Sequence, residues 1–168
     1  IVDISGELVI LSSEFIHREL NEAGVLKDKK DYIIANRTIN SDYLDKIVEI
    51  PSGTKVLFVN ELPEIVFGVI KHLEDIGISH LQYHPYYPGI KDFDTSIRVA
   101  VTPGEALLVP SFIEKSYDIG PRIMDFTTIT KILSKLDILD EKAGQFSQRY
   151  LEKTIKISQR LAESKNEV

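Results

Sequence analysis

Cysteine is absent from this sequence of 168 residues, and its only methionine is Met124. The lack of cysteine excludes a disulfide framework, a thiolate zinc site and a cysteine nucleophile. It also fits a reducing compartment, so we expect a cytoplasmic protein. No run approaches eighteen uninterrupted apolar residues and no signal peptide is visible, so we expect no contact with a membrane.

Positive charge is also scarce, with 20 Lys and Arg against 26 Asp and Glu and a net charge of −6. The longest basic run, residues 27–30, contains an acid, and we expect no direct contact with nucleic acid. Among the four histidines, His80 and His84 stand four apart on a predicted strand. They would lie roughly 13 Å from each other there, too far to chelate one metal ion. The sequence therefore predicts no metal and no cofactor.

Familiar motifs of nucleotide and hydrolase chemistry are missing. The sequence has no GxGxxG after a strand, no phosphate-binding P-loop, no GxSxG elbow and no HExxH. A receiver domain would need an aspartate after its third strand, but that strand ends in Tyr83 and His84. These absences argue against the best-known enzymes of the α/β class and against a phosphoacceptor domain.

Apolar segments alternate with helical patterns through the middle of the chain. The predicted strands are 31–36, 55–60, 80–84, 96–102 and 121–126, and the predicted helices are 41–50, 63–77, 110–116 and 129–136. Strands that are apolar throughout and separated by helices indicate a parallel sheet covered on both faces. We therefore predict an α/β domain over 31–138, three-layered and flavodoxin-like, with a five-stranded parallel sheet.

Two further regions flank this domain, over 1–30 and 139–168. Residues 1–11 predict a β-hairpin, followed by a short helix that Ser12 or Ser13 caps. Residues 140–166 predict one long polar helix with a heptad-like apolar seam; the seam consists of Ala143, Phe146, Tyr150, Ile157 and Leu161. Either this helix packs back on its own sheet, or it forms a homodimeric coiled coil or an inter-domain signalling helix.

Polar and aromatic residues gather at the predicted carboxyl ends of the strands, where open parallel sheets bind ligands. The amide and hydroxyl side chains there can form hydrogen bonds with a ligand, and an arginine can bind an anion through two N–H groups. Tyrosine rings can line such a site with apolar surface and a hydroxyl group. Helix N-termini converge on the same rim. The candidate ligand-binding residues are Asn36, Arg37, Asn60, Glu61, His84, Tyr86, Tyr87, Thr102, Glu105 and Arg122.

Each of these residues also has a purely structural interpretation. The two asparagines suit helix caps, and Arg37 suits an ion pair with Glu61 or Glu64. The sequence from Thr102 to Gly104 suits a turn. In the stretch HPYYPG (residues 84–89), the prolines suit a stiff crossover that lacks a helix. The binding interpretation rests on the convergence of all of them at one rim.

Two other functions stay open alongside a sensor of small molecules. His84 with Glu61, Glu64, Glu105 or Asp118 would make the base and orienting carboxylate of a small hydrolase or transferase. Alternatively, the tyrosine-rich loop is an interface and the chain is an oligomerisation or docking module, since tyrosine is enriched at interface cores.

The sequence also resembles a known family, over residues 1–165. The stretches "YIIANRTINSDYLDKIVEIPSGTKVLFVNELPEIVFGVIKHLEDIGISHLQYHPYYPG", "AVTPGE" and "DIGPRIMDFTTITKIL" look like the sensory region of bacterial sigma-54-dependent transcription activators and related signalling proteins. More distantly, the chain is similar to one lobe of the flavodoxin-like receptor domain of propionate-catabolism activators, although that receptor has two lobes.

The resemblance implies a ligand-sensing or signal-relay role, with no catalytic residues to carry over. It also implies that the long helix leads into a PAS domain and that the ATPase and DNA-binding parts lie elsewhere in the full protein. The sequence begins at Ile1 without a methionine and stops within a helix-compatible run. We therefore expect a piece of a longer protein.

Overall fold

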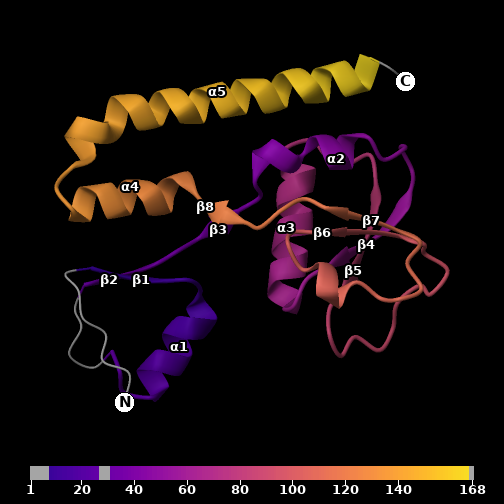
Figure 1. The fold of residues 1–168 in the computed structure, drawn as a ribbon, viewed down its shortest axis with the longest axis horizontal. Helices are drawn as coiled ribbons and strands as arrows, with labels where there is room; N and C mark the ends of the chain where they lie inside the picture. Colours follow the sequence, from indigo (N-terminus) through magenta and orange to yellow (C-terminus); the bar gives the residue numbers. More distant parts are fainter. Residues whose placement is uncertain (1–7, 27–30, 167–168) are drawn as a thin grey trace. The chain divides into compact units, whose positions relative to one another are not determined.

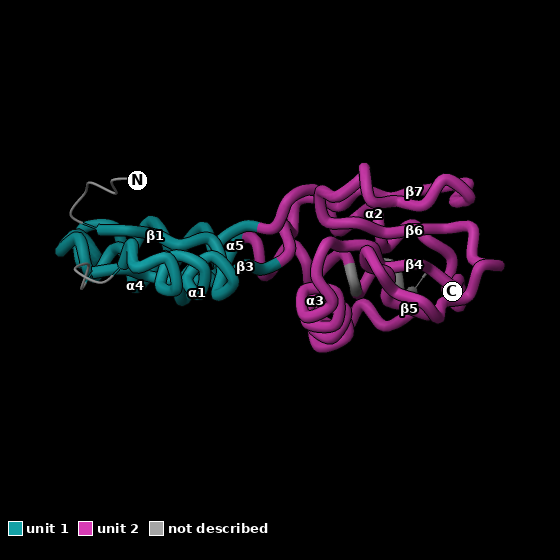
Figure 2. The backbone as a smooth tube through the Cα atoms, turned by 90° about the horizontal axis from the view of Figure 1, so that it is seen from below, with its two compact units in different colours: residues 1–38, 123–152 teal, residues 39–122, 153–168 magenta. Residues whose placement is uncertain are grey.

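A computed structural model describes residues 8–26 and 31–166 of the chain. They fall into two compact units, each built from two segments of the chain (Figure 2). Unit 1 combines residues 1–38 with 123–152, and unit 2 combines residues 39–122 with 153–168. Each predicted domain (1–30, 31–138 and 139–168) is one continuous segment of the chain, whereas each observed unit combines two segments that are far apart in the sequence. No helix in the described ranges has both the length and the apolar character needed to cross a membrane.

Unit 2 contains a four-stranded parallel sheet with the order β5-β4-β6-β7 (Figure 1). Its strands are β4 (Lys55–Val59), β5 (Gln82–Tyr86), β6 (Val99–Thr102) and β7 (Lys115–Asp118). Val56 pairs with Tyr83 on one side and with Val99 on the other, which makes β4 a central strand. The predicted parallel sheet is therefore confirmed in its class.

The two faces of this sheet bury different residues because successive side chains of a strand alternate in direction. Val56 and Phe58 face α3 (Pro63–Asp75), which contributes Val66, Val69 and Leu73 to the same core. We call this the α3-side core; its other buried members are Ile39, Leu44, Ile47, Ile50, Ile78, Leu81, Val101 and Ile119. Within this core, Leu44 directly follows η1 (Ser41–Tyr43, a 3-10 helix), and Ile47 belongs to α2 (Asp45–Val48).

The opposite face is covered by a loop instead of a helix. Leu57 and Val59 pack there with Ile97 and Ala100, and we call this group the loop-side core. Its cover comes from η2 (Ala106–Leu108) and the residues after it. The helix predicted over 110–116 is wrong, since Lys115–Asp118 form β7 and pair with β6. Long-range pairing with β6 overrides the local helical pattern of this segment.

The first and last predicted strands do not join the four-stranded sheet. β2 (Tyr32–Ile34) pairs in parallel with β1 (Val9–Leu11), and β3 (Arg37–Thr38) pairs antiparallel with β8 (Ile123–Met124). The five-stranded arrangement predicted over 31–138 is therefore not the one observed. Apolar composition marks a buried strand but says nothing about its partner. The first strand of the predicted hairpin lies outside the described residues.

Unit 1 surrounds its short strands with three helical segments: α1 (Glu14–Glu22), α4 (Phe126–Lys135) and the part of α5 (Leu139–Asn166) up to residue 152. Ser13 caps α1 by accepting a hydrogen bond from the Ile16 N–H at 3.3 Å, as predicted. Phe126 of α4 stacks on Phe146 of α5 and meets Tyr150 of α5 at a tilt, with ring centroids 4.8 and 4.6 Å away.

From residue 153 onward α5 belongs to unit 2 and contacts that unit directly. Ile157 packs against the α3-side core. Lys153 pairs with Asp42 at 3.2 Å, and Arg160 pairs with Asp45 at 2.6 Å. Of the predicted seam residues, Ile157 packs on the core of the sheet, as the alternative of a helix that packs back requires. Phe146 and Tyr150 contact α4 instead. The side chain of Leu161 lies outside what the structure describes.

Candidate functional site

Asn60 lies where the carboxyl ends of β4 and β5 meet. Its N–H donates to the Tyr86 carbonyl at 3.2 Å, so the ladder between the two strands continues one residue past β4. Alternation along the strand then puts Asn60 on the face of Phe58, beside the start of α3. Asn60 therefore lies at the rim of the sheet, as predicted.

The side chain of Asn60 is only 3% exposed, yet its amide has no hydrogen-bond partner among the described residues. It does not cap α3, whose N-cap residue is Leu62 without any side-chain hydrogen bond. No fully enclosed side-chain nitrogen or oxygen in the described part of the chain lacks a partner, so solvent still reaches this amide. A carboxamide offers two donors and one acceptor, and burial without a partner is costly.

The two tyrosines of the loop pack on their own sheet, one on each face. Tyr86 belongs to the loop-side core and meets Phe93 edge-on, with centroids 5.0 Å apart. Tyr87 packs against the α3-side core and meets Phe67 of α3 at 6.5 Å. Much of the aromatic surface of this loop is thus used in core packing, and both tyrosines remain half-buried beside Asn60.

Thr102 and Asp118 hold a turn at the ends of β6 and β7. The Thr102 hydroxyl accepts a hydrogen bond from the Glu105 N–H at 3.1 Å. The Asp118 carboxylate accepts from the N–H groups of Gly104 at 3.0 Å and Gly120 at 2.8 Å. Thr102 therefore forms part of a turn, which was its structural interpretation in the sequence. The part played by Asp118 was missed, although an aspartate two residues before a glycine is a recognised turn signal.

His84 occupies the middle of β5, because this strand continues to Tyr86 instead of ending at His84. It pairs with Leu57 and is half-buried. Within the described ranges its side chain forms no hydrogen bond or ion pair with a carboxylate. The arrangement of base and carboxylate that a hydrolase or transferase would need is not formed here.

The other candidate residues are dispersed. Asn36 and Arg37 are exposed members of unit 1, while the remaining candidates belong to unit 2. The backbone of Asn36 is held by Thr128, whose hydroxyl accepts from its N–H at 2.9 Å. Arg37 forms no ion pair in the part of the chain that the structure describes. Glu61 is exposed, and Arg122, which follows β7 in the sequence, is half-buried.

Two groups of unit 2 have shifted acidities, and neither lies at the rim. Burial raises the pKa of Tyr83 far above its usual range, helped by the charge of Glu74, while its hydroxyl donates to the Ile78 carbonyl at 3.0 Å. Hydrogen bonds from the Ser96 hydroxyl and N–H, and then from Lys55, hold the pKa of Asp94 well below its usual range. Both groups stabilise local structure.

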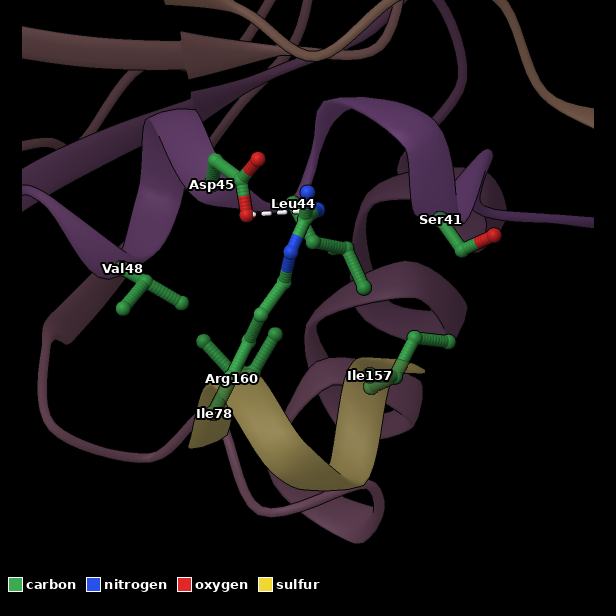
Figure 3. A pocket seen from close by; sticks show the side chains of 7 residues that line it. All are labelled: Ser41, Leu44, Asp45, Val48, Ile78, Ile157 and Arg160. Carbon is green, nitrogen blue, oxygen red and sulfur yellow. Dashed lines mark ion pairs between the residues drawn. The ribbon is translucent and has the colours of Figure 1, made fainter. Parts of the chain in front are cut away.

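A small cavity of unit 2 lies away from the rim, under α5 (Figure 3). Its volume of about 10 Å³ is room for roughly one water molecule. No cluster of three or more metal-ligating side chains occurs among the described residues.

No family model, curated protein or solved structure matches this chain.

Proposed function

We propose that this chain is a non-catalytic sensor module of a bacterial transcription regulator. It binds a small metabolite at the carboxyl ends of β4, β5 and β6, and it relays binding through α5 to a downstream domain of the same protein. The observation that carries the proposal is Asn60, a buried side chain at this rim whose amide has no partner in the described residues.

The strand order supports a ligand at this rim. Counted along the chain, the strands of the sheet run 2-1-3-4, since β5 and β6 flank β4. This is the beginning of the flavodoxin-like order, in which the connections change direction between the first and third strands. Ligands of open α/β sheets bind outside the carboxyl ends at that point, which here lies between β4 and β6. Such an order agrees with the flavodoxin-like receptor that the sequence resembles.

The position of α5 supports the relay. This helix contributes residues up to 152 to unit 1 and the remainder to unit 2. A ligand shifts a conformational equilibrium only if it binds one state more tightly than the other. α5 is the element through which a rearrangement in unit 2 would be passed on toward the carboxyl end of the chain.

Replacing Asn60 by leucine is expected to abolish ligand binding without unfolding the protein. Leucine has a similar volume and removes no hydrogen bond to a described residue, so folding should be little changed. Thermal unfolding of the purified chain with succinate, citrate, glutamine or inorganic phosphate measures this. A probe present at 100 times its Kd should raise the Tm of the wild type by about 5–10 °C and leave that of the variant unchanged.

The matched control is Asn36→Leu, since Asn36 is exposed and its side chain forms no hydrogen bond in the described residues. It should retain the full shift in Tm. A probe that raises the Tm of Asn60→Leu as much as that of the wild type would place the binding site elsewhere.

A second candidate function, homodimerisation through 140–166, is favoured by one observation on α5. Leu151 and Ile155, one turn apart, are 58% and 55% exposed. Exposed apolar pairs on a helix suit a partner helix. If this stripe forms a dimer, the double variant Leu151→Gln, Ile155→Gln should sediment as a monomer at concentrations where the wild type sediments as a dimer. Arg149→Gln, an exposed change on the same helix, should remain dimeric. A monomeric wild type would remove this candidate.

A further inference from the structure

Among the described side chains of the carboxyl-terminal half of α5, one apolar residue and two basic residues contact unit 2. We propose that residues 153–160, which we call the strap, dock on unit 2 reversibly, so that the docked and released strap are two states of the protein. This inference follows from the contacts of the strap alone and is independent of a ligand at Asn60.

The apolar part of the attachment is a single side chain. Ile157 is half-buried and packs against the α3-side core. It shares the lining of the small cavity with Leu44, Val48 and Ile78 (Figure 3). A gap of about 10 Å³ remains at this contact, so the packing is incomplete. Unfilled space forfeits dispersion contacts and weakens docking.

The polar part includes two ion pairs on the same face of the helix. Lys153 precedes Ile157 by four residues and pairs with Asp42, and Arg160 follows it by three and pairs with Asp45. These spacings align the three side chains along one face. Lys153 thus has an acidic partner on unit 2. Both ion pairs are partly exposed and are weakened by salt.

A comparison with α3 shows how weak this attachment is. α3 inserts Val66, Val69 and Leu73 into the same core, and these side chains are 0–6% exposed. In the strap, only Ile157 and Arg160 are even half-buried, and the other side chains are exposed. Segments with few buried apolar contacts open at lower free energy than the core around them. The strap should therefore release while the sheet and α3 stay folded.

Release has a defined consequence for the surface of unit 2. Leu44 is 4% exposed and Ile78 is fully buried while the strap is docked, and both line the hollow under Ile157. Departure of the strap would uncover this apolar hollow beside the carboxylates of Asp42 and Asp45. Since exposing apolar surface is unfavourable, the docked state remains the major one at low salt.

Amide hydrogen exchange of the full chain, followed by mass spectrometry, tests the strap. At 0.01 M salt the Debye length is about 30 Å, and at 1 M it is about 3 Å. Amides of 153–160 should exchange faster at 1 M, because a released strap is a short helix end that frays in water, with α3 unchanged as the internal reference. The double variant Lys153→Gln, Arg160→Gln should exchange about tenfold faster in the strap at low salt and lose most of the salt dependence.

Two further variants sharpen the test. Ile157→Ala should raise strap exchange at both salt concentrations, because it removes the apolar contact and leaves the ion pairs. Arg149→Gln, which removes a charge from α5 outside the strap, should change neither rate. If strap amides exchange as slowly as those of α3 in the wild type and in the double variant, the strap opens only with global unfolding and the proposal is wrong. An increase in α3 exchange that matches that of the strap would overturn it as well.

Discussion

Replacing Phe58 by alanine is expected to lower the free energy of unfolding by about 3–5 kcal/mol. Phe58 lies in the central strand β4, its side chain is 0% exposed, and its ring meets that of Tyr83 edge-on with centroids 6.3 Å apart. Truncation removes its transfer free energy and leaves a cavity between the sheet and α3. Strands on both sides of β4 limit how far the site can collapse.

Urea unfolding followed by circular dichroism measures this loss. The matched control is Phe67→Ala on α3, where the same side chain is 54% exposed. That change should cost about 1 kcal/mol or less, since little area is buried and alanine favours the helix. Equal losses in the two variants would mean that Phe58 is not at the centre of the α3-side core.

Gly120→Ala is expected to destabilise the protein by about 2–4 kcal/mol, from two separate causes. The φ angle of Gly120 is +68°, a left-handed conformation that L-residues adopt at a cost. An added Cβ would also come within 2.7–3.0 Å of the Tyr43 ring. Tyr43 cannot swing away without losing Lys46, whose ammonium lies 5.1 Å from the ring centroid and donates to the Asp118 carbonyl.

Gly53→Ala separates the two causes, because Gly53 has a similar φ of +79° with nothing within 4 Å of an added Cβ. It should lose only the conformational part, about 1–2 kcal/mol. Both losses are read from urea unfolding curves under the same conditions. If Gly120→Ala costs no more than Gly53→Ala, the contact of Tyr43 with Gly120 contributes nothing to stability.

Much of the local structure was predictable from the chain itself. A serine cap at residue 12 or 13, the start of α3 at Pro63, the buried strand β4 and the length of α5 all follow from patterns within a few residues. Such signals are local because caps, turns and hydrophobic periods depend on neighbours in sequence. Asn60 was also predictable as a rim residue, since it directly follows an apolar strand.

The position of a candidate residue was predictable where it depended only on the strand that carries it, and not where it depended on how strands pair. Asn36 was expected beside Asn60 because both follow apolar strands, yet β2 pairs with β1 and not with the sheet of unit 2. Likewise, Tyr86 and Tyr87 were identified as unusual, but their packing on opposite faces depends on where β5 ends.

By itself, then, the sequence determined the class of the central domain, the absence of cysteine chemistry and the positions of its best-patterned helices and strands. The tertiary structure alone decided which strands pair, that Asn60 is buried without capping α3, and that Ile157 of the long helix packs on the α3-side core. The reason is physical. Local propensity acts over a few residues, whereas strand pairing and side-chain packing join segments far apart in the chain, which short-range patterns do not encode.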